Sequence, residues 1–199
     1  ATKAQIAFQI DQMLAQMLFR DLQNTVKVDD AAVQKYYDAH KNEYEEVKAR
    51  HILVRFKDSR VPLREGQKEL SDDEAKAKAG ELKKKLDAGA DFATMAKAES
   101  DDTGTGAQGG DLGQFGRGQM VPEFDTAAFA QPVGKVGEPV RSAFGYHLIL
   151  IDERGAKKFE EVRGDIEQAL KPQIGQKAIE GLKTKSAVTY DEGYFGKAQ

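Results

Sequence analysis

Residues 47–55 read VKARHILVR and predict a β-strand, because β-branched and leucine side chains fill the second half and no glycine or proline interrupts them. Residues 146–152, YHLILID, predict a second strand with a continuously apolar centre. Between them, residues 71–74 (SDDE) form a capping box, which predicts a helix that ends at Gly89. Strands and helices in this order predict a small domain of mixed α/β layers.

The rest of this middle region predicts a short helix at 91–98, a loop at 103–110 and a short strand at 111–115. Residues 104–109, GTGAQG, match the dinucleotide-binding fingerprint as a string. That mechanism requires a strand before the glycines and a helix after them, and the sequence predicts neither. We therefore interpret this stretch as a flexible loop and expect no nucleotide site.

Both ends of the chain have helical periodicity. Apolar residues recur every three or four positions in 1–24 and in 158–185, where Pro172 predicts a kink, and a shorter helix follows Asp29. The tail at 187–190 predicts a short strand. Amphipathic helices need a partner for their apolar face. The terminal segments could pack on each other, on the middle domain, or on a second copy of the chain.

The composition excludes several classes of protein. The 199 residues include no cysteine and three histidines, so thiol chemistry, disulfides and a histidine-rich metal centre are not expected. The net charge of −3 argues against a general binder of nucleic acid. We see neither a membrane-spanning run nor a signal peptide. Because an apolar stripe already runs at the first residues without a cap, we expect a truncated or processed N-terminus.

His51 and His147 each lie in a predicted apolar strand. Either one alone is typical of a core histidine that has found a hydrogen-bond partner. On neighbouring strands, however, the two rings could share a proton through facing nitrogens. Ser142 carries no local sign of an activated nucleophile, so a hydrolase is not favoured. Basic residues at 57, 60, 64 and 68 predict a solvated face or, less commonly, a site for phosphate or an acidic segment.

Four segments, in order along residues 47–153, resemble the parvulin-type peptidyl-prolyl cis/trans isomerases. They are ARHILV at 49–54, GGDLGQFGRGQM at 109–120, FDTAAF at 124–129 and GYHLI at 145–149. The flanking segments are similar to those of extracytoplasmic chaperone–foldases of the SurA and PrsA type, through YYDAH at 36–40 and the apolar stripe at 159–187.

The resemblance implies an α+β fold: a small antiparallel sheet with surrounding helices, inserted between N- and C-terminal segments that form a helical chaperone domain. Residues 47–153 would be the isomerase domain. Residues 1–46 would form the N-terminal part of the helical chaperone domain, and residues 154–199 would pack against that part.

The resemblance also implies the site. The paired histidines of the family fall on His51 and His147, its central polar position on Asp102, and its hydroxyl beside the second histidine on Ser142. Burial could raise the pKa of Asp102 and allow it to donate a hydrogen bond. The prolyl-ring pocket falls on apolar residues of the middle region: Leu112, Met120, Phe124 and Phe144.

Two positions depart from the commonest pattern of the family. Val121 replaces a frequent glutamine, and Phe144 makes the site more apolar. The basic residues that select phosphorylated substrates in some members of the family have no clean match in this sequence, and Arg55 is the nearest.

The resemblance implies that the protein accelerates X–Pro isomerisation in unfolded or partly folded client polypeptides, outside the cytoplasm of a bacterium. It implies no cofactor or metal, no nucleic-acid partner and no membrane span in this chain. The alternative is a non-catalytic holdase whose parvulin domain only binds peptides. The flanking helices could also form a homodimer.

Overall fold

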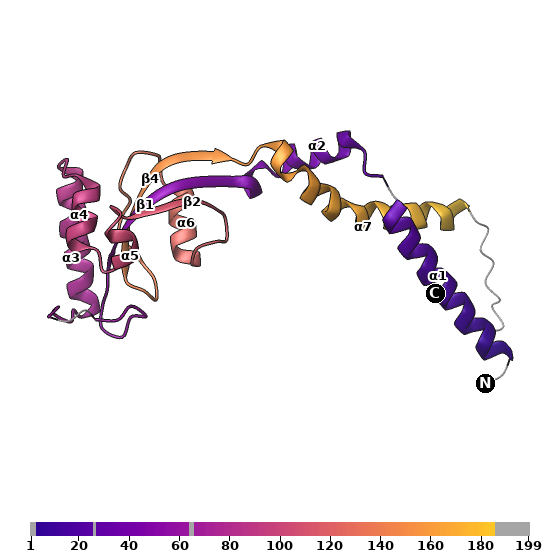
Figure 1. The fold of residues 1–199 in the computed structure, drawn as a ribbon, viewed down its shortest axis with the longest axis horizontal. Helices are drawn as coiled ribbons and strands as arrows, with labels where there is room; N and C mark the ends of the chain where they lie inside the picture. The colour runs from indigo at the N-terminus through magenta and orange to yellow at the C-terminus, as the bar shows by residue number, and fades with distance from the viewer. Residues whose placement is uncertain (1–2, 26, 64–65, 186–199) are drawn as a thin grey trace. The chain divides into compact units, whose positions relative to one another are not determined.

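A computed structural model of the chain describes residues 3–25, 27–63 and 66–185 (Figure 1). The chain divides into two compact units: residues 41–157 form one, and the residues on either side of this stretch form the other.

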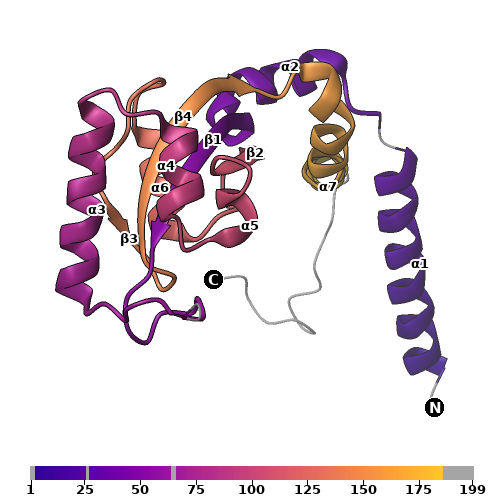
Figure 2. The ribbon, with the colours of Figure 1, turned by 60° about the vertical axis from the view of Figure 1, so that its left-hand side comes forward.

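A four-stranded sheet is the centre of the first unit (Figure 2). Its spatial order is β2-β1-β4-β3, and every pair of neighbours is antiparallel. The strands are β1 (Glu45–Val54), β2 (Asp111–Gly116), β3 (Val140–Arg141) and β4 (Tyr146–Ala156). The antiparallel sheet that the resemblance implies is therefore confirmed.

Four helices and a 3-10 turn complete this unit. They are η1 (Lys41–Tyr44), α3 (Asp72–Asp87), α4 (Phe92–Glu99), α5 (Thr103–Gly106) and α6 (Pro122–Ala130). The capping box before α3 is formed, with Ser71 and Glu74 bonding to each other's backbone N–H groups.

The loop predicted at 103–110 is wrong in its first half, where α5 makes one helical turn. The carboxylate of Asp102 accepts the N–H groups of Gly104 and Thr105 at 3.1 and 3.3 Å. This N-cap outweighs the low helix propensity of the two glycines in the turn.

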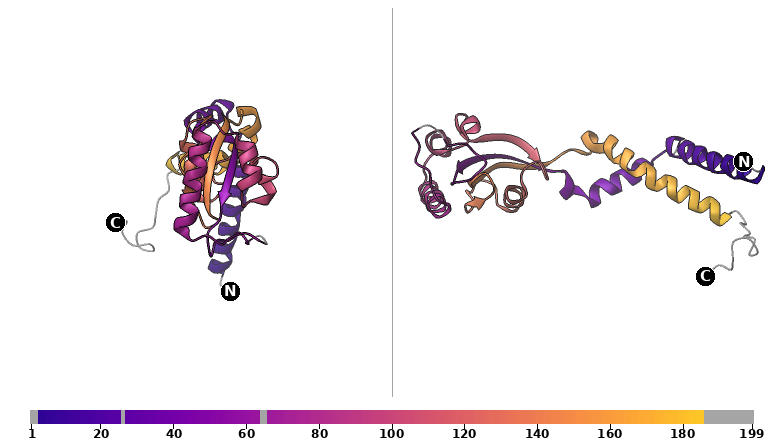
Figure 3. Two further views of the ribbon diagram at one scale, coloured as in Figure 1. Left: turned by 90° about the vertical axis from the view of Figure 1, so that its left-hand side faces the viewer. Right: turned by 90° about the horizontal axis from the view of Figure 1, so that it is seen from below.

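Helices cover both faces of the sheet (Figure 3, left panel). Ile52 of β1 and Leu148 of β4 point to the face that α3 and α4 cover. Ala49 and Ile149 point to the opposite face, which α6 covers. Successive side chains of a strand point to opposite faces. Every second residue of β1, counted from Ala49, and of β4, counted from Ile149, therefore faces α6.

The second unit is helical, with α1 (Lys3–Thr25), α2 (Asp30–Ala39) and α7 (Phe159–Lys185). α2 begins at the predicted cap Asp29, and the rings of Tyr37 and Phe159 meet edge to face, with centroids 5.7 Å apart. α7 continues across Pro172. The strand predicted at 187–190 lies outside the described residues.

α1 carries large apolar side chains that remain exposed, among them Ile6, Phe8, Met13, Leu14, Met17 and Leu18. Within the described residues, none of the helices combines the length and hydropathy that crossing a bilayer would need.

Candidate active site

The register of β1 and β4 brings the two site histidines together. His51 pairs with Ile149 and Leu53 pairs with His147, so the histidines are diagonal neighbours on the α6 face of adjacent strands. Both are buried, with 5% of each residue exposed. Their rings are nearly parallel, and their Nδ1 atoms are 3.2 Å apart.

A chain of hydrogen bonds continues from both rings. His51 Nε2 lies 2.9 Å from Asp102 Oδ2 and 3.0 Å from the hydroxyl of Thr105. On the other side, His147 Nε2 lies 2.7 Å from Ser142 Oγ, which also accepts the N–H of Phe144 at 3.1 Å. The structure thus brings together all four polar residues that the resemblance names.

The direction of this chain follows from the groups at its ends. An ionised Asp102 can only accept, so His51 carries its proton on Nε2 and presents a lone pair at Nδ1. His147 must then donate through its own Nδ1 and accept at Nε2, where the Ser142 hydroxyl donates. Every ring nitrogen has one partner of the correct kind, which fixes both neutral tautomers.

Burial keeps both histidines neutral. Desolvation lowers the pKa of His51, although the hydrogen bond and the charge of Asp102 oppose this shift. The pKa of His147 falls to about 3, first through desolvation and then through repulsion from a charged His51. The pair therefore supplies oriented dipoles rather than a positive charge at neutral pH.

The pKa of Asp102 is lowered, whereas the sequence led us to expect a raised one. Burial alone would raise its pKa, but hydrogen bonds from the Thr105 hydroxyl, the His51 ring and the Thr105 N–H outweigh burial and lower it. The expected raised pKa is wrong, because the N-cap position surrounds the carboxylate with donors. Asp102 is thus an acceptor.

An apolar cavity of about 580 Å³ opens beside the histidines. The four apolar residues named from the sequence all line it: Leu112, Met120, Phe124 and Phe144. Phe124 contacts both imidazoles edge to face, with ring centroids 5.9 Å from His51 and 5.2 Å from His147. Val121 also lines the cavity, so this departure from the family pattern adds apolar surface where the family often has an amide.

Gly110 explains why a glycine pair precedes β2. Its φ is +84°, and a Cβ there would lie 2.3 Å from the carbonyl oxygen of His51. Its own carbonyl accepts the His51 N–H at 2.8 Å. Only glycine allows this approach, which holds the backbone of His51 in place.

Sequence reasoning missed several residues of the site. Thr105 is the most informative, because it donates to Asp102 Oδ2 at 2.6 Å and lies within reach of His51. Part of the signal was present, because aspartate is a favoured N-cap residue and Asp102 is the N-cap of α5. Of the other lining residues, Leu53 and Gln119 lie inside the segments quoted at 49–54 and 109–120, whereas Val61, Pro62, Asp101 and Thr103 come from segments without a motif. In the described part of the chain, no three potential metal ligands cluster together.

A small antiparallel sheet bearing a buried histidine pair beside an apolar cavity defines the parvulin class of domain. Residues 31–155 match the family described as PPIC-type PPIASE domain, and the chain belongs to this family.

Relatives match beyond this domain. The chain is 38% identical over 191 residues to the foldase protein PrsA of Caldanaerobacter subterraneus subsp. tengcongensis, an alignment that covers 96% of this chain and 53% of the relative. It is 47% identical over 105 residues to foldase protein PrsA 4 of Bacillus cereus, covering 52% of this chain and 37% of the relative. The chain spans about half the length of such relatives.

Among solved structures, the chain is similar to a peptidylprolyl isomerase (PrsA) from Bacillus cereus. The TM-score is 0.50 at 28% identity, and the alignment covers 96% of this chain and 77% of the other.

Proposed function

We propose that the chain is a peptidyl-prolyl cis/trans isomerase that acts on unfolded or partly folded polypeptides. The observation that carries this proposal is a single apolar cavity of the size of a short peptide segment. A neutral, fully hydrogen-bonded histidine pair lies in its wall.

The chemistry needs no bond between enzyme and substrate. Rotation about an X–Pro bond breaks amide resonance, which gives a barrier of about 20 kcal/mol and uncatalysed times of tens of seconds or more. The planar amide is strongly dipolar, and the twisted amide is less so. A water-poor cavity therefore favours the twisted form relative to water.

The two parts of the site have different tasks in this mechanism. Leu112, Met120 and Phe124 hold the prolyl ring by shape and dispersion, so that the rest of the peptide turns about it. The histidine pair, held by Asp102 and Ser142, presents oriented dipoles near the rotating carbonyl. Neither histidine takes a proton from the substrate.

The clients would be proline-containing polypeptides. The exposed apolar side chains of α1 support weak contact with unfolded segments, and they also support a homodimer formed through the flanking helices. We propose that the protein acts outside the cytoplasm, because its sequence contains no cysteine and because it resembles SurA- and PrsA-type foldases. In this proposal residues 47–153 isomerise, and residues 1–46 and 154–199 provide the chaperone surface.

A refolding assay tests the proposal. The protein is added in catalytic amounts to a client whose refolding is limited by a trans-to-cis or cis-to-trans proline step. We expect the slow phase to accelerate with wild-type protein and the acceleration to be lost with His147→Ala, whose folding is checked by thermal unfolding. If His147→Ala matches the wild type, the assignment of the site fails. If wild-type protein only suppresses aggregation in stoichiometric amounts, the holdase alternative is correct.

A further inference from the structure

The short turn between β2 and α6, residues 117–121, supplies one wall of the cavity. Gln119, Met120 and Val121 of this turn all line the cavity. Met120 is also one of the residues that hold the prolyl ring in the proposed mechanism. Connecting segments are more mobile than the elements that they join. The precision of this wall therefore depends on the side chains that anchor the turn.

Two anchors lie in the turn and in the helix that follows it. Gln119 Oε1 accepts the N–H of Gly116 at 3.0 Å. Asp125 Oδ1, in the first turn of α6, accepts the N–H of Gly118 at 2.8 Å. Gly118 has a φ of +77°, which glycine adopts without strain. These bonds set the local shape of the turn, but they join it only to its neighbours in the sequence.

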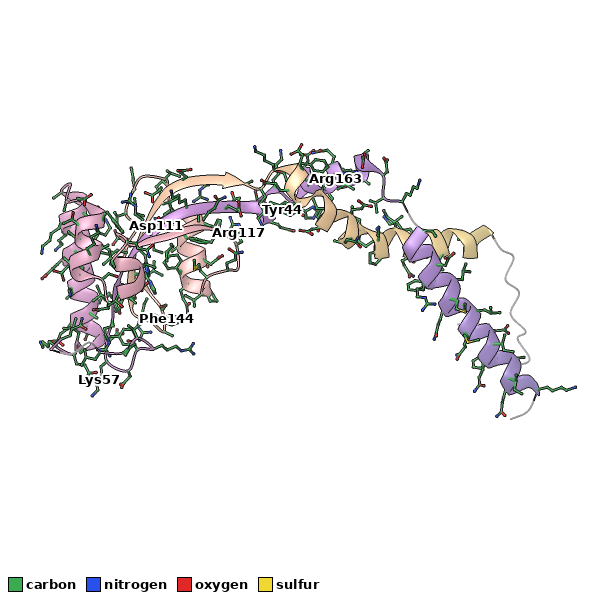
Figure 4. The ribbon with its side chains drawn as sticks, in the orientation of Figure 1. Tyr44, Lys57, Asp111, Arg117, Phe144 and Arg163 are labelled. Atoms are coloured by element: carbon green, nitrogen blue, oxygen red, sulfur yellow. The ribbon has the colours of Figure 1, made fainter. Side chains whose placement is uncertain are left out.

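Arg117 ties the turn to more distant elements. Its Nε donates to the carbonyl oxygen of Asn42 in η1 at 3.0 Å, and its Nη2 pairs with the carboxylate of Glu45 at the start of β1. Its guanidinium carbon lies 4.4 Å from the centre of the Phe129 ring, near the end of α6. Figure 4 shows Arg117 and Tyr44, the last residue of η1, at the same end of the sheet. One side chain thus connects the turn to η1, β1 and α6.

The contacts of Arg117 suit a planar cation. A guanidinium can bond in its plane to a carbonyl and a carboxylate while its face lies on an aromatic ring. The ring of Phe129 is itself fixed, because it is buried and meets Phe115 of β2 edge to face, with centroids 6.1 Å apart. The side chain of Arg117 is 40% exposed. It therefore acts on a substrate through the position of the turn rather than by contact.

On the basis of the proposed isomerase function, we propose that Arg117 is a positioning residue that fixes the Met120 wall and thereby makes the cavity selective for a five-membered ring. A wall that is held in place fits the prolyl ring closely and excludes a larger ring. One methylene group in a hydrophobic pocket changes kcat/KM by about 10–200-fold. Selectivity for ring size therefore measures how firmly the turn is held.

The test compares two peptides, one with proline and one with its six-membered homologue, pipecolic acid, at the same position. The measured quantity is the ratio of their kcat/KM values. We expect wild-type protein to favour the prolyl peptide at least about tenfold. Arg117→Ala should reduce this ratio about fivefold, because activity on the prolyl peptide falls while activity on the pipecolyl peptide changes less than about twofold. A general loss of folded protein lowers both values equally and leaves the ratio unchanged.

Arg50→Ala is the matched control. Arg50 also pairs with a carboxylate, that of Asp152, and its guanidinium carbon lies 5.5 Å from the centre of the Phe92 ring. Phe92 belongs to the core on the α3 and α4 side of the sheet, opposite the face that carries the histidine pair. We therefore expect Arg50→Ala to keep the wild-type ratio.

Glu45→Gln gives a second test that leaves Arg117 in the chain. It removes the charge of one partner and should lower the ratio in the same direction by about twofold. Combined with Arg117→Ala, it should lower the ratio no further than Arg117→Ala does alone. An unchanged ratio in Arg117→Ala, a ratio near one in wild-type protein, or additive effects of the two substitutions would each overturn the role of Arg117. Wild-type protein without activity on either peptide would instead refute the isomerase function.

Discussion

His51 and His147 face each other through like atoms, with their Nδ1 nitrogens 3.2 Å apart. A hydrogen bond between two nitrogens needs one proton, so the pair cannot hold a proton on both Nδ1 atoms. Asp102 decides which nitrogen carries it, because an ionised carboxylate accepts from His51 Nε2. The site is thus a directed chain from Ser142 to Asp102, and its order rests on that carboxylate staying ionised.

Stability should depend on pH through this pair. The pKa of His147 is about 3 in the folded protein against 6.5 ordinarily, and that of His51 is also lowered. Between those values the unfolded chain binds protons that the native site does not, so the free energy of unfolding falls as pH decreases from 6.5. We expect His147 to contribute a slope approaching about 1.4 kcal/mol per pH unit. Urea unfolding at several pH values should show a shallower slope for His147→Gln, and identical slopes would refute buried neutrality.

Ser142 is only 2% exposed, and its hydroxyl has both its donor and its acceptor role occupied. Ser142→Ala leaves His147 Nε2 without a donor, which should destabilise the fold by about 1–3 kcal/mol and lower kcat/KM about tenfold. Ser142→Thr keeps the hydroxyl and is expected to retain most of the activity. Denaturant midpoints and peptide isomerisation rates measure the two effects. Full activity in the alanine variant would remove Ser142 from the site.

Thr105 stabilises the ionised form of Asp102. Thr105→Val keeps the shape of the side chain and removes the hydroxyl that bonds to the carboxylate at 2.6 Å. The pKa of Asp102 should therefore rise, and the acid limit of the pH–rate profile should move to higher pH. Thr105→Ser restores the donor and should restore the profile. A profile in the valine variant that overlays the wild type would show that Thr105 has no part in the site.

Replacing Met120 is expected to weaken substrate binding without changing the stability of the fold. Its side chain is partly buried, lines the cavity and packs at the edge of the α6-side core. Met120→Ala should lower kcat/KM by about tenfold or more, through lost contact with the prolyl ring, while unfolding changes little. Met95→Ala is the control, because Met95 is also partly buried but packs on the α3 face. Similar activity losses in both variants would indicate a general effect of core packing.

The sequence predicted the frame of this site because the frame depends on local patterns. The apolar runs at 47–55 and 146–152 predict the two strands that carry His51 and His147, and the Ser71 capping box marks the start of α3. The register of the two strands was not predictable from these patterns. It sets the distance between the rings and therefore the direction of the hydrogen bonds.

The parts that the sequence did not predict depend on contacts between distant segments. Asp102 was expected to have a raised pKa because burial was weighed without the donors of α5, which a loop prediction had removed. Val61 and Pro62 line the cavity from a connection that carries no motif. Such contacts follow from tertiary packing rather than from spacing in the sequence.

The most direct test of the site is catalysed cis/trans exchange of one X–Pro peptide, followed by NMR exchange spectroscopy between about pH 5 and pH 8 with wild-type protein. A neutral histidine pair and an ionised Asp102 do not change their charge over this range. We therefore expect strong acceleration that varies by less than about twofold. An absence of acceleration, or a rate that follows a single titration near pH 6.5, would contradict a neutral pair working beside an apolar cavity.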